Sequence, residues 1–339
     1  MQANTSVGSV EGGVSGMDEY LKILTMERGE GRIRLRSPAK INLFLEPVRK
    51  RPDGYHDLVT VMQTVDLCDE VEVEVGREGQ GIELRCDRPD VPTGPENLAW
   101  RAAEAFAAES GSGPGVRIGI RKRIPVGGGL GGGSSNAAVT LLGLNELSGR
   151  PLARRKLVRA AASVGSDVAF FLYGGTALCT GRGERVKVLR PAPEFWAVLV
   201  MPPTRLSTKE TYERLNLGLT KRHSVRRMLR SITRSSVQLL RESVHNGLAA
   251  TVLAGSPSLR GLWEEVVSEG LPYPQVSGSG STLYGVCCTE AEAAEVSQRL
   301  RGRLPGDVVV AVARSRLASA KENDHGDHRS QGQPEGGRQ

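Results

Sequence analysis

The chain has 339 residues, 39% of them hydrophobic, and a formal net charge of +7; this length and composition suit two domains with buried cores. The longest apolar run, residues 195–201, is far too short to span a membrane, and the N-terminus lacks the basic-then-apolar pattern of a signal peptide. Five cysteines, an odd number without C-x-x-C spacing, argue against a cysteine zinc site and a disulfide framework, and they predict a cytoplasmic protein.

The first half of the chain begins with residues 1–31, whose polar and glycine-rich composition predicts a disordered extension. Strands are expected where apolar and polar residues alternate or where apolar residues run together, at 32–46, 59–67, 70–75 and 116–124. The spacing of apolar residues predicts helices over 97–109 and 152–164, on either side of a glycine-rich segment.

The second half continues with a predicted hairpin at 176–189, which turns at 181–183, and a buried strand at 195–201. Two or three helices are expected in 208–268, a small-residue loop and a strand in 276–288, a last strand at 308–314, and a disordered tail over 318–339. Because helices and strands do not alternate regularly, the pattern predicts an α+β fold. The proline-rich stretch 191–193 predicts a boundary between domains at 32–190 and 191–317.

The most distinctive segment is Pro125–Asn136, in which six of the nine residues from Gly127 are glycine. Glycines let backbone N–H groups converge on an anion, and a helix that begins just after them adds unpaired N–H groups and the positive end of its dipole. Ser134 or Ser135 is a good N-cap for such a helix, and Gly149 is a good stop. The segment therefore predicts a phosphate-binding loop.

Three other interpretations of this segment fit less well. It contains G-x-G-x-x-G, but the following helix runs into Arg150 and further basic residues, not into the strand with an acidic end that a dinucleotide-binding fold requires. A P-loop is excluded because the chain has no Gly-Lys dipeptide. A flexible linker would not lead into a well-formed helix.

The basic charge is partly local. Arg222, Arg226, Arg230 and Arg234 recur every four residues and predict a ridge on one helix. A solvated helix face is the favoured interpretation, since aromatic residues make up only 4% of the chain and are not interleaved with basic ones as in single-strand binders. A basic surface also suits an enzyme with phosphorylated substrates.

Three further segments carry chemically useful side chains. In SPAKIN, Lys40 and Asn42 lie two residues apart on a strand and face the same side, although a lone lysine of this kind is commonly a surface residue. In GSDVAFFL, either Ser166 or Asp167 simply caps a short apolar helix, or Asp167 is a partly enclosed carboxylate that accepts a proton from a substrate hydroxyl. VSGSGST, residues 276–282, is either an ordinary tight turn or a place where the backbone approaches a ligand closely.

In this order, these segments resemble the GHMP kinases. The family's phosphate loop, P-x-x-x-G-L-G-G-S-S, is matched by Pro125–Ser135 with one extra glycine. PAKINL, RPDGYH, GSDVAFFLYGGTALCTGRGE and VSGSGST agree with the same family, and the resemblance covers roughly residues 33–316. It implies two domains, an N-terminal domain like ribosomal protein S5 and a C-terminal ferredoxin-like domain.

The resemblance also implies an activity, the transfer of the γ-phosphoryl group of ATP to a tertiary hydroxyl of a cytidine-diphosphate-linked methylerythritol in the non-mevalonate isoprenoid route. The segment RPDGYH favours this substrate over those of other GHMP kinases. The resemblance implies that His56 binds the edge of a cytosine ring, and only a cytosine-bearing substrate offers that ring. The alternatives are a mevalonate- or homoserine-type kinase and, outside the family, a basic nucleic-acid-binding protein. We expect ATP with Mg²⁺, small-molecule partners, no nucleic acid or membrane, and a monomer or weak homodimer.

The family's catalytic base matches Asp167, and its cationic partner matches Lys40. Two departures from the family pattern lie beside this base, Ser166 in place of alanine and Ala169 in place of proline. Both changes are small, so we expect the position of Asp167 to be kept.

The resemblance implies binding roles for three further groups of residues. The ATP phosphates would be held by Lys122, Pro125, Gly127, Gly128, Gly129, Leu130, Gly131, Gly132, Gly133, Ser134, Ser135 and Asn136. The second substrate would be bound by Asn42, Tyr55, His56 and Tyr212, with a supporting loop formed by Gly278, Ser279 and Gly280. Ser134 or Ser135 would be the protein ligand of Mg²⁺.

Overall fold

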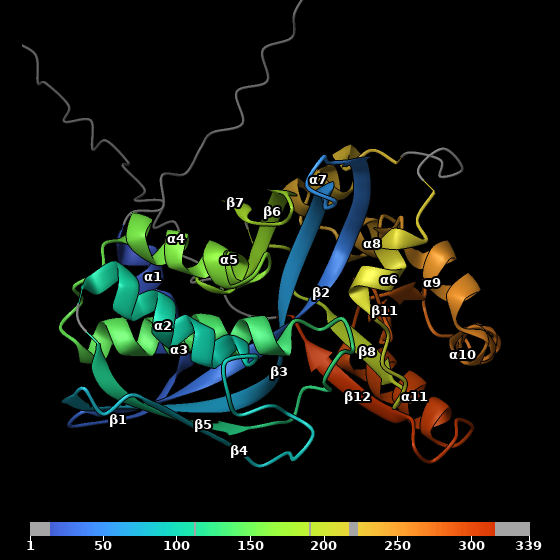
Figure 1. Ribbon diagram of the computed structural model, residues 1–339. Coiled ribbons are helices and arrows are strands. Elements are labelled where there is room, and N and C mark those ends of the chain that lie inside the picture. Colours follow the sequence, from blue (N-terminus) through green and yellow to red (C-terminus); the bar gives the residue numbers. More distant parts are fainter. Residues whose placement is uncertain (1–13, 112, 190, 217–222, 316–339) are drawn as a thin grey trace, which may run out of the picture.

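Two β-sheets organise the protein, and helices pack against them (Figure 1). The computed structural model describes residues 14–111, 113–189, 191–216 and 223–315. Within these ranges the larger sheet has eight strands, with β1-β2-β3-β5-β4 in order, β6 beside β3, β7 beside β6 and β9 beside β2; the smaller sheet has four, in the order β10-β11-β8-β12. The predicted α+β fold is therefore confirmed.

The strands of the larger sheet are β1 (Thr25–Gly29), β2 (Arg32–Lys50), β3 (His56–Glu78), β4 (Ile82–Cys86), β5 (Pro114–Arg121), β6 (Thr176–Gly181), β7 (Arg185–Val188) and β9 (His245–Asn246). Those of the smaller sheet are β8 (Trp196–Met201), β10 (Gln275–Val276), β11 (Leu283–Cys287) and β12 (Val309–Arg314). The described helices are α1 (Val14–Leu24), α2 (Leu98–Ser110), α3 (Gly132–Leu147), α4 (Arg154–Val164), α5 (Val168–Phe171), α6 (Thr208–Glu213), α7 (Arg226–Thr233), α8 (Val237–Arg241), α9 (Ala249–Gly255), α10 (Pro257–Ser268) and α11 (Glu290–Arg301).

The long antiparallel pair β2–β3 forms because both sequences alternate apolar and charged residues. Arg34 lies opposite Glu72 and Leu35 lies opposite Val71, so charged pairs line one face and aliphatic pairs the other. The aliphatic face belongs to a core that also holds buried residues of α2, α3 and α4, and these helices lie over that side of the sheet (Figure 1). The two strands expected at 59–67 and 70–75 are one strand, because the pairing with β2 continues through the residues between them.

The smaller sheet is built around β8, which lies between β11 and β12 and is antiparallel to both. Five of its six residues are buried, as the uninterrupted apolar run at 195–201 predicts. The predicted hairpin is also present, with β6 antiparallel to β7. Because β9 pairs with β2, the chain beyond residue 191 adds a strand to the larger sheet, and the expected domain boundary stays a prediction.

The expectation of a disordered extension over residues 1–31 is wrong for its described part, which forms α1 and β1. Met17, Tyr20, Leu21 and Leu24 are buried in the core of the larger sheet. Their spacing places them on one face of a helix, a signal that the polar average composition of this region conceals. Residues 1–13 and the tail expected over 318–339 lie outside the described residues.

The described part of the region 208–268 contains five helices, α6 to α10, where two or three were expected, because several are short helices with separate caps. Ser207, Ser236 and Ser256 each accept a capping hydrogen bond from a backbone N–H at the start of α6, α8 and α10. On the predicted basic ridge, Arg226, Arg230 and Arg234 are exposed, and Arg222 lies outside the described residues. In the part of the chain that is described, we find no helix with the length and apolar character needed to cross a membrane.

The burial of α1 predicts that Leu24→Ala lowers the free energy of unfolding by about 2–5 kcal/mol, because it opens a cavity in the core. Leu24 is fully buried, whereas nearby Met26 is 43% exposed. Met26→Ala is the matched control and should change that free energy by no more than about 0.5 kcal/mol. Urea unfolding of both variants measures the difference, and equal stabilities would show that α1 is not part of the core.

Candidate active site

A cavity of about 1050 Å³ lies where β2, β3, the glycine-rich segment and the loop before β11 meet. It brings together most of the predicted site residues: Lys40, Asn42, Tyr55, His56, Lys122, Pro125, Gly127, Gly128, Gly129, Leu130, Gly131, Gly132, Gly133, Ser134, Asn136, Asp167, Tyr212, Gly278 and Ser279. Two predicted residues, Ser135 and Gly280, are not among its lining residues. Segments up to about 240 residues apart in sequence thus share one site.

The glycine segment is held by its carbonyl groups. The carbonyl oxygens of Gly128, Gly129 and Leu130 accept hydrogen bonds from Thr282 N–H, the Ser277 hydroxyl and Lys40 N–H, at 3.1, 3.0 and 2.9 Å. In a trans peptide the next N–H points away from the carbonyl. The N–H groups of the following residues are therefore directed to the opposite side of the loop, which suits binding of an anion.

Close packing explains why glycine is needed in this loop. Gly129 has φ +75°, and a Cβ built there would lie 2.0 Å from the carbonyl oxygen of Ser277. A side chain would both strain the backbone and push the two loops apart. The segment 276–282 therefore packs closely against the backbone of the glycine loop.

The helix after the loop begins at Gly132, with Gly131 as its N-cap and no side-chain capping bond. The expectation that Ser134 or Ser135 caps this helix is therefore wrong. Ser135 lies in the first turn, and its buried hydroxyl accepts a hydrogen bond from Ser37 at 2.8 Å. The first residues of α3 line the cavity, and the N-terminal N–H groups of this helix have no side-chain cap, so they are suited to bind phosphate.

Lys122 is held in place by a carboxylate that sequence reasoning missed. The fully buried Asp69 forms an ion pair with Lys122 Nζ and accepts hydrogen bonds from the N–H groups of Arg123 and Ile124, at 2.7 and 2.8 Å. It also accepts one from Asn136 Nδ2 at 3.0 Å. The alternation of the strand does contain a signal for Asp69. Residues 69, 71 and 73 point to the same face, so an aspartate in line with Val71 and Val73 is a charged residue on the buried face.

Lys40 and Asp167 lie together beside the glycine loop. Lys40 Nζ is 3.8 Å from Asp167 Oδ2, and the lysine is nearly fully buried whereas the aspartate side chain is 29% exposed. Burial lowers the pKa of the Lys40 ammonium, and the Asp167 charge opposes that shift. Asp167 makes no side-chain capping bond to α5, so its carboxylate is available to the cavity.

Asn42 orients the lysine, as their shared face predicts. Its Oδ1 accepts a hydrogen bond from Lys40 Nζ at 2.5 Å, and its Nδ2 donates to Thr60 Oγ1 at 2.9 Å. The supporting loop is close, since a Cβ added at Gly278 would lie 3.3 Å from both the amide oxygen and Lys40 Nζ. Asn246 Nδ2 in turn donates to the Gly278 carbonyl at 2.7 Å, a contact that the sequence did not reveal.

A second end of the cavity carries aromatic and basic groups. The His56 and Tyr212 rings are stacked with centroids 5.2 Å apart, and the buried Nδ1 of His56 lacks a hydrogen-bond partner among the described groups. Burial and the Lys50 charge lower the pKa of His56, so its imidazole is neutral at pH 7. A buried polar atom without a partner at a cavity points to a ligand that supplies one.

Tyr55 lies differently from His56, with 55% of its surface exposed. The Arg182 guanidinium lies 4.9 Å from the Tyr55 ring centroid, and both residues line the cavity. Arg182 was not among the predicted site residues. It lies in the turn of the β6–β7 hairpin. Its position between two glycines predicts a turn but gives no sign of a binding residue.

The comparisons with known proteins agree with one another. Residues 97–175 match the family model described as GHMP kinases N terminal domain. A relative from Geobacter sulfurreducens, named 4-diphosphocytidyl-2-C-methyl-D-erythritol kinase, is 39% identical over 273 residues, which cover 80% of this chain and 96% of the relative. A crystal structure of 4-(cytidine 5'-diphospho)-2C-methyl-D-erythritol kinase is 33% identical with a TM-score of 0.68, covering 83% of this chain and 98% of that one.

A crystal structure of homoserine kinase from Cytophaga hutchinsonii also shares the fold. Its TM-score is 0.66 over 86% of this chain and 97% of that chain, but it is only 17% identical. The common fold therefore leaves the choice of substrate to the side chains in the cavity.

The packing of the two loops predicts that Gly129→Ala lowers the free energy of unfolding by about 2–5 kcal/mol, the sum of backbone strain and overpacking. Gly133→Ala is the matched control, because a Cβ there would meet only Leu98 at 3.6 Å on the exposed side of α3. It should change that free energy by no more than about 0.5 kcal/mol. Denaturant unfolding compares the two variants; similar values would mean that the loops do not pack as described.

Proposed function

This chain belongs to the 4-diphosphocytidyl-2-C-methyl-D-erythritol kinases, a branch of the GHMP kinases, and we propose how its cavity carries out their reaction. The γ-phosphoryl group of ATP passes to the 2-hydroxyl of 4-diphosphocytidyl-2-C-methyl-D-erythritol, a step of isoprenoid biosynthesis. The observation that carries the proposal is one cavity that joins an anion-binding loop, a lysine–aspartate pair and a buried histidine edge.

The phosphates of ATP lie against the glycine loop in this proposal. The N–H groups on the outer side of the loop and at the start of α3 donate to phosphate oxygens. Lys122 adds a positive charge, and its ion pair with Asp69 keeps its side chain in one position. The loop therefore does not need the lysine of a P-loop. Lys122, which directly follows β5, supplies the positive charge instead.

Ser134 fits the role of a protein ligand to Mg²⁺, and Ser135 does not. Ser134 lines the cavity, whereas the Ser135 hydroxyl is buried against Ser37. Mg²⁺ prefers oxygen ligands and keeps several waters, so one hydroxyl beside the phosphates is enough for the protein's share. When bound with ATP, the ion neutralises charge on the phosphates.

Asp167 is the proposed base. Its partly exposed carboxylate accepts the proton of the substrate hydroxyl as the hydroxyl oxygen bonds to the γ-phosphorus and ADP leaves. Lys40 contacts the same carboxylate and stabilises the negative charge that develops on the transferred group. Asn42 holds the lysine in that position through its hydrogen bond, and it also lies where the methylerythritol hydroxyls would bind.

The cytidine end of the substrate is assigned to the histidine side of the cavity. The free Nδ1 of neutral His56 supplies a hydrogen bond to the edge of the base, and the stacked Tyr212 supports the imidazole. Tyr55 with Arg182 offers a flat, cationic surface on which an aromatic base can stack. This end of the cavity favours a cytidine substrate over mevalonate or homoserine, neither of which carries a base.

We further propose that the protein acts in the cytoplasm, on small molecules only, as a monomer or weak homodimer. The five free cysteines support a reducing compartment. The alternative of nucleic-acid binding would use the exposed arginines of α7, whose opposite side packs Met228 and Ile232 into the protein. Salt-sensitive binding to DNA or RNA without phosphoryl transfer would support that alternative.

Asp167→Asn is expected to lower turnover by about 10²–10⁴-fold, because the amide cannot accept the hydroxyl proton. ATP affinity, measured by calorimetry, should stay near normal because the phosphate loop is unchanged. Glu213→Gln is the control, since this carboxylate is exposed on the wall of the same cavity and should keep its turnover. Near-normal turnover of Asp167→Asn would remove this residue as the base.

His56→Ala is expected to raise KM for the cytidine substrate by about tenfold to a hundredfold, since one buried hydrogen bond to the base is lost. Tyr55→Phe keeps the aromatic ring and should change KM little. An ADP-release assay measures both, with mevalonate and homoserine as competing acceptors. Transfer to either competitor in preference to the cytidine substrate, or a loss of ATP affinity in His56→Ala, would contradict the assignment.

A further inference from the structure

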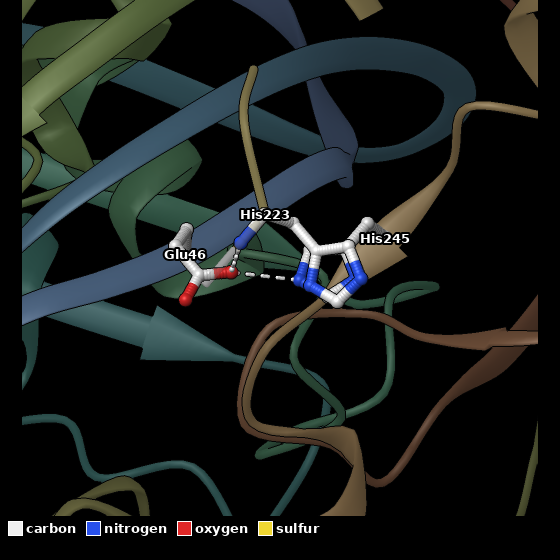
Figure 2. A group of neighbouring side chains, drawn as sticks. All are labelled: Glu46, His223 and His245. Atoms are coloured by element: carbon white, nitrogen blue, oxygen red, sulfur yellow. Dashed lines mark hydrogen bonds and ion pairs between the residues drawn. The ribbon is translucent and has the colours of Figure 1, made fainter. Parts of the chain in front are cut away.

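A cluster of ligand-type side chains lies apart from the residues assigned to the reaction. Glu46 at the end of β2, His223 before α7 and His245 in β9 converge from three segments of the chain (Figure 2). One atom from each, a carboxylate oxygen or an imidazole nitrogen, lies within 4.8 Å of the others. Nothing in the proposed phosphoryl transfer uses these side chains.

The charge of the cluster favours a cation. Glu46 is only 5% exposed, and among the described residues its ion-pair partner is His245, whose Nε2 lies 2.8 Å from Glu46 Oε2. A buried carboxylate is costly unless it is paired, and a bound cation would supply that pairing.

We propose that Glu46, His223 and His245 form a binding site for a divalent transition-metal ion, of which Zn²⁺ is the best probe. Two imidazoles and one carboxylate are a ligand set that Zn²⁺ accepts, with a fourth position left for water. The site holds no cysteine, so the spacing of the cysteines gave no sign of it.

The His223 and His245 rings now lie with their centroids 4.0 Å and their planes 34° apart, so one ring must turn before both direct a nitrogen at the same ion. Metal–ligand bonds of about 2.0–2.2 Å keep the ligand atoms of one ion no more than about 4 Å apart. The exposed His223 side chain can close the remaining gap by turning, while Glu46 and His245 are already in contact. For His245 to bind the ion through Nε2, the proton that this nitrogen shares with Glu46 Oε2 moves to Nδ1 of the same ring, which leaves a neutral imidazole with an Nε2 lone pair for the ion.

The fold already ties these segments together. β9 pairs with β2 through Phe44 and His245, and the His223 N–H donates to Glu46 Oε2 at 3.4 Å. The next residue, Asn246, donates to the Gly278 carbonyl beside the proposed catalytic lysine. An ion at the cluster would therefore strengthen the strand pair that supports this loop.

A bare hydrogen-bonded cluster is the competing explanation, and binding of Zn²⁺ alone distinguishes the two. Metal-stripped protein without nucleotide is dialysed against Zn²⁺, and the bound metal is measured by elemental analysis. We expect one Zn²⁺ per cluster and a higher Tm when Zn²⁺ is added. His223→Ala should weaken binding at least about tenfold and abolish the rise in Tm; because His223 is exposed, the variant should fold.

The histidines at 325 and 328 provide the matched control, since a tail with this sequence can also bind metal. The double variant His325→Ala and His328→Ala should keep the cluster's Zn²⁺ and the rise in Tm. The proposal is overturned if the metal-stripped protein binds no Zn²⁺, if His223→Ala binds it as tightly as the unchanged protein, or if only the tail variant loses it. Glu46→Gln, which keeps the size of the side chain, should weaken binding in the same way as His223→Ala.

Discussion

The site depends on one buried carboxylate. Asp69 lies in β3, and it accepts hydrogen bonds from the two backbone N–H groups just before the glycine loop as well as from Lys122 and Asn136. A fully buried charge is costly unless it is paired and hydrogen-bonded. The strand, the loop and helix α3 must therefore keep their relative positions for this charge to be satisfied, and the phosphate-binding surface is made by that arrangement.

The second constraint is the irregular pairing of β2 with β3. The register shifts between Pro38 and Ala39 and again between Asn42 and Phe44, on either side of Lys40. Such bulges change the direction of side chains locally. The regular end of β2 builds the core with its alternating pattern, whereas the bulged end turns a lysine and an amide toward the cavity. One strand thus serves both packing and chemistry.

Much of the fold follows from local patterns in the sequence. Alternation predicts β2 and the β6–β7 hairpin, and an uninterrupted apolar run predicts β8, because these signals depend on neighbouring residues only. Helix α1 was missed because its four buried residues lie within polar and glycine-rich surroundings. The N-cap of α3 was assigned to a serine because capping preference is local, whereas Ser135 is engaged by Ser37 from a distant strand.

The sequence by itself determined the glycine loop, the shared face of Lys40 and Asn42, and the family to which the order of these motifs belongs. Only the tertiary structure decided that Asp69 holds Lys122, that His56 stacks on Tyr212, and that Glu46 meets two histidines. The physical reason is the distance along the chain. Contacts between segments far apart depend on how strands pair and helices pack, and no period within a single segment encodes them.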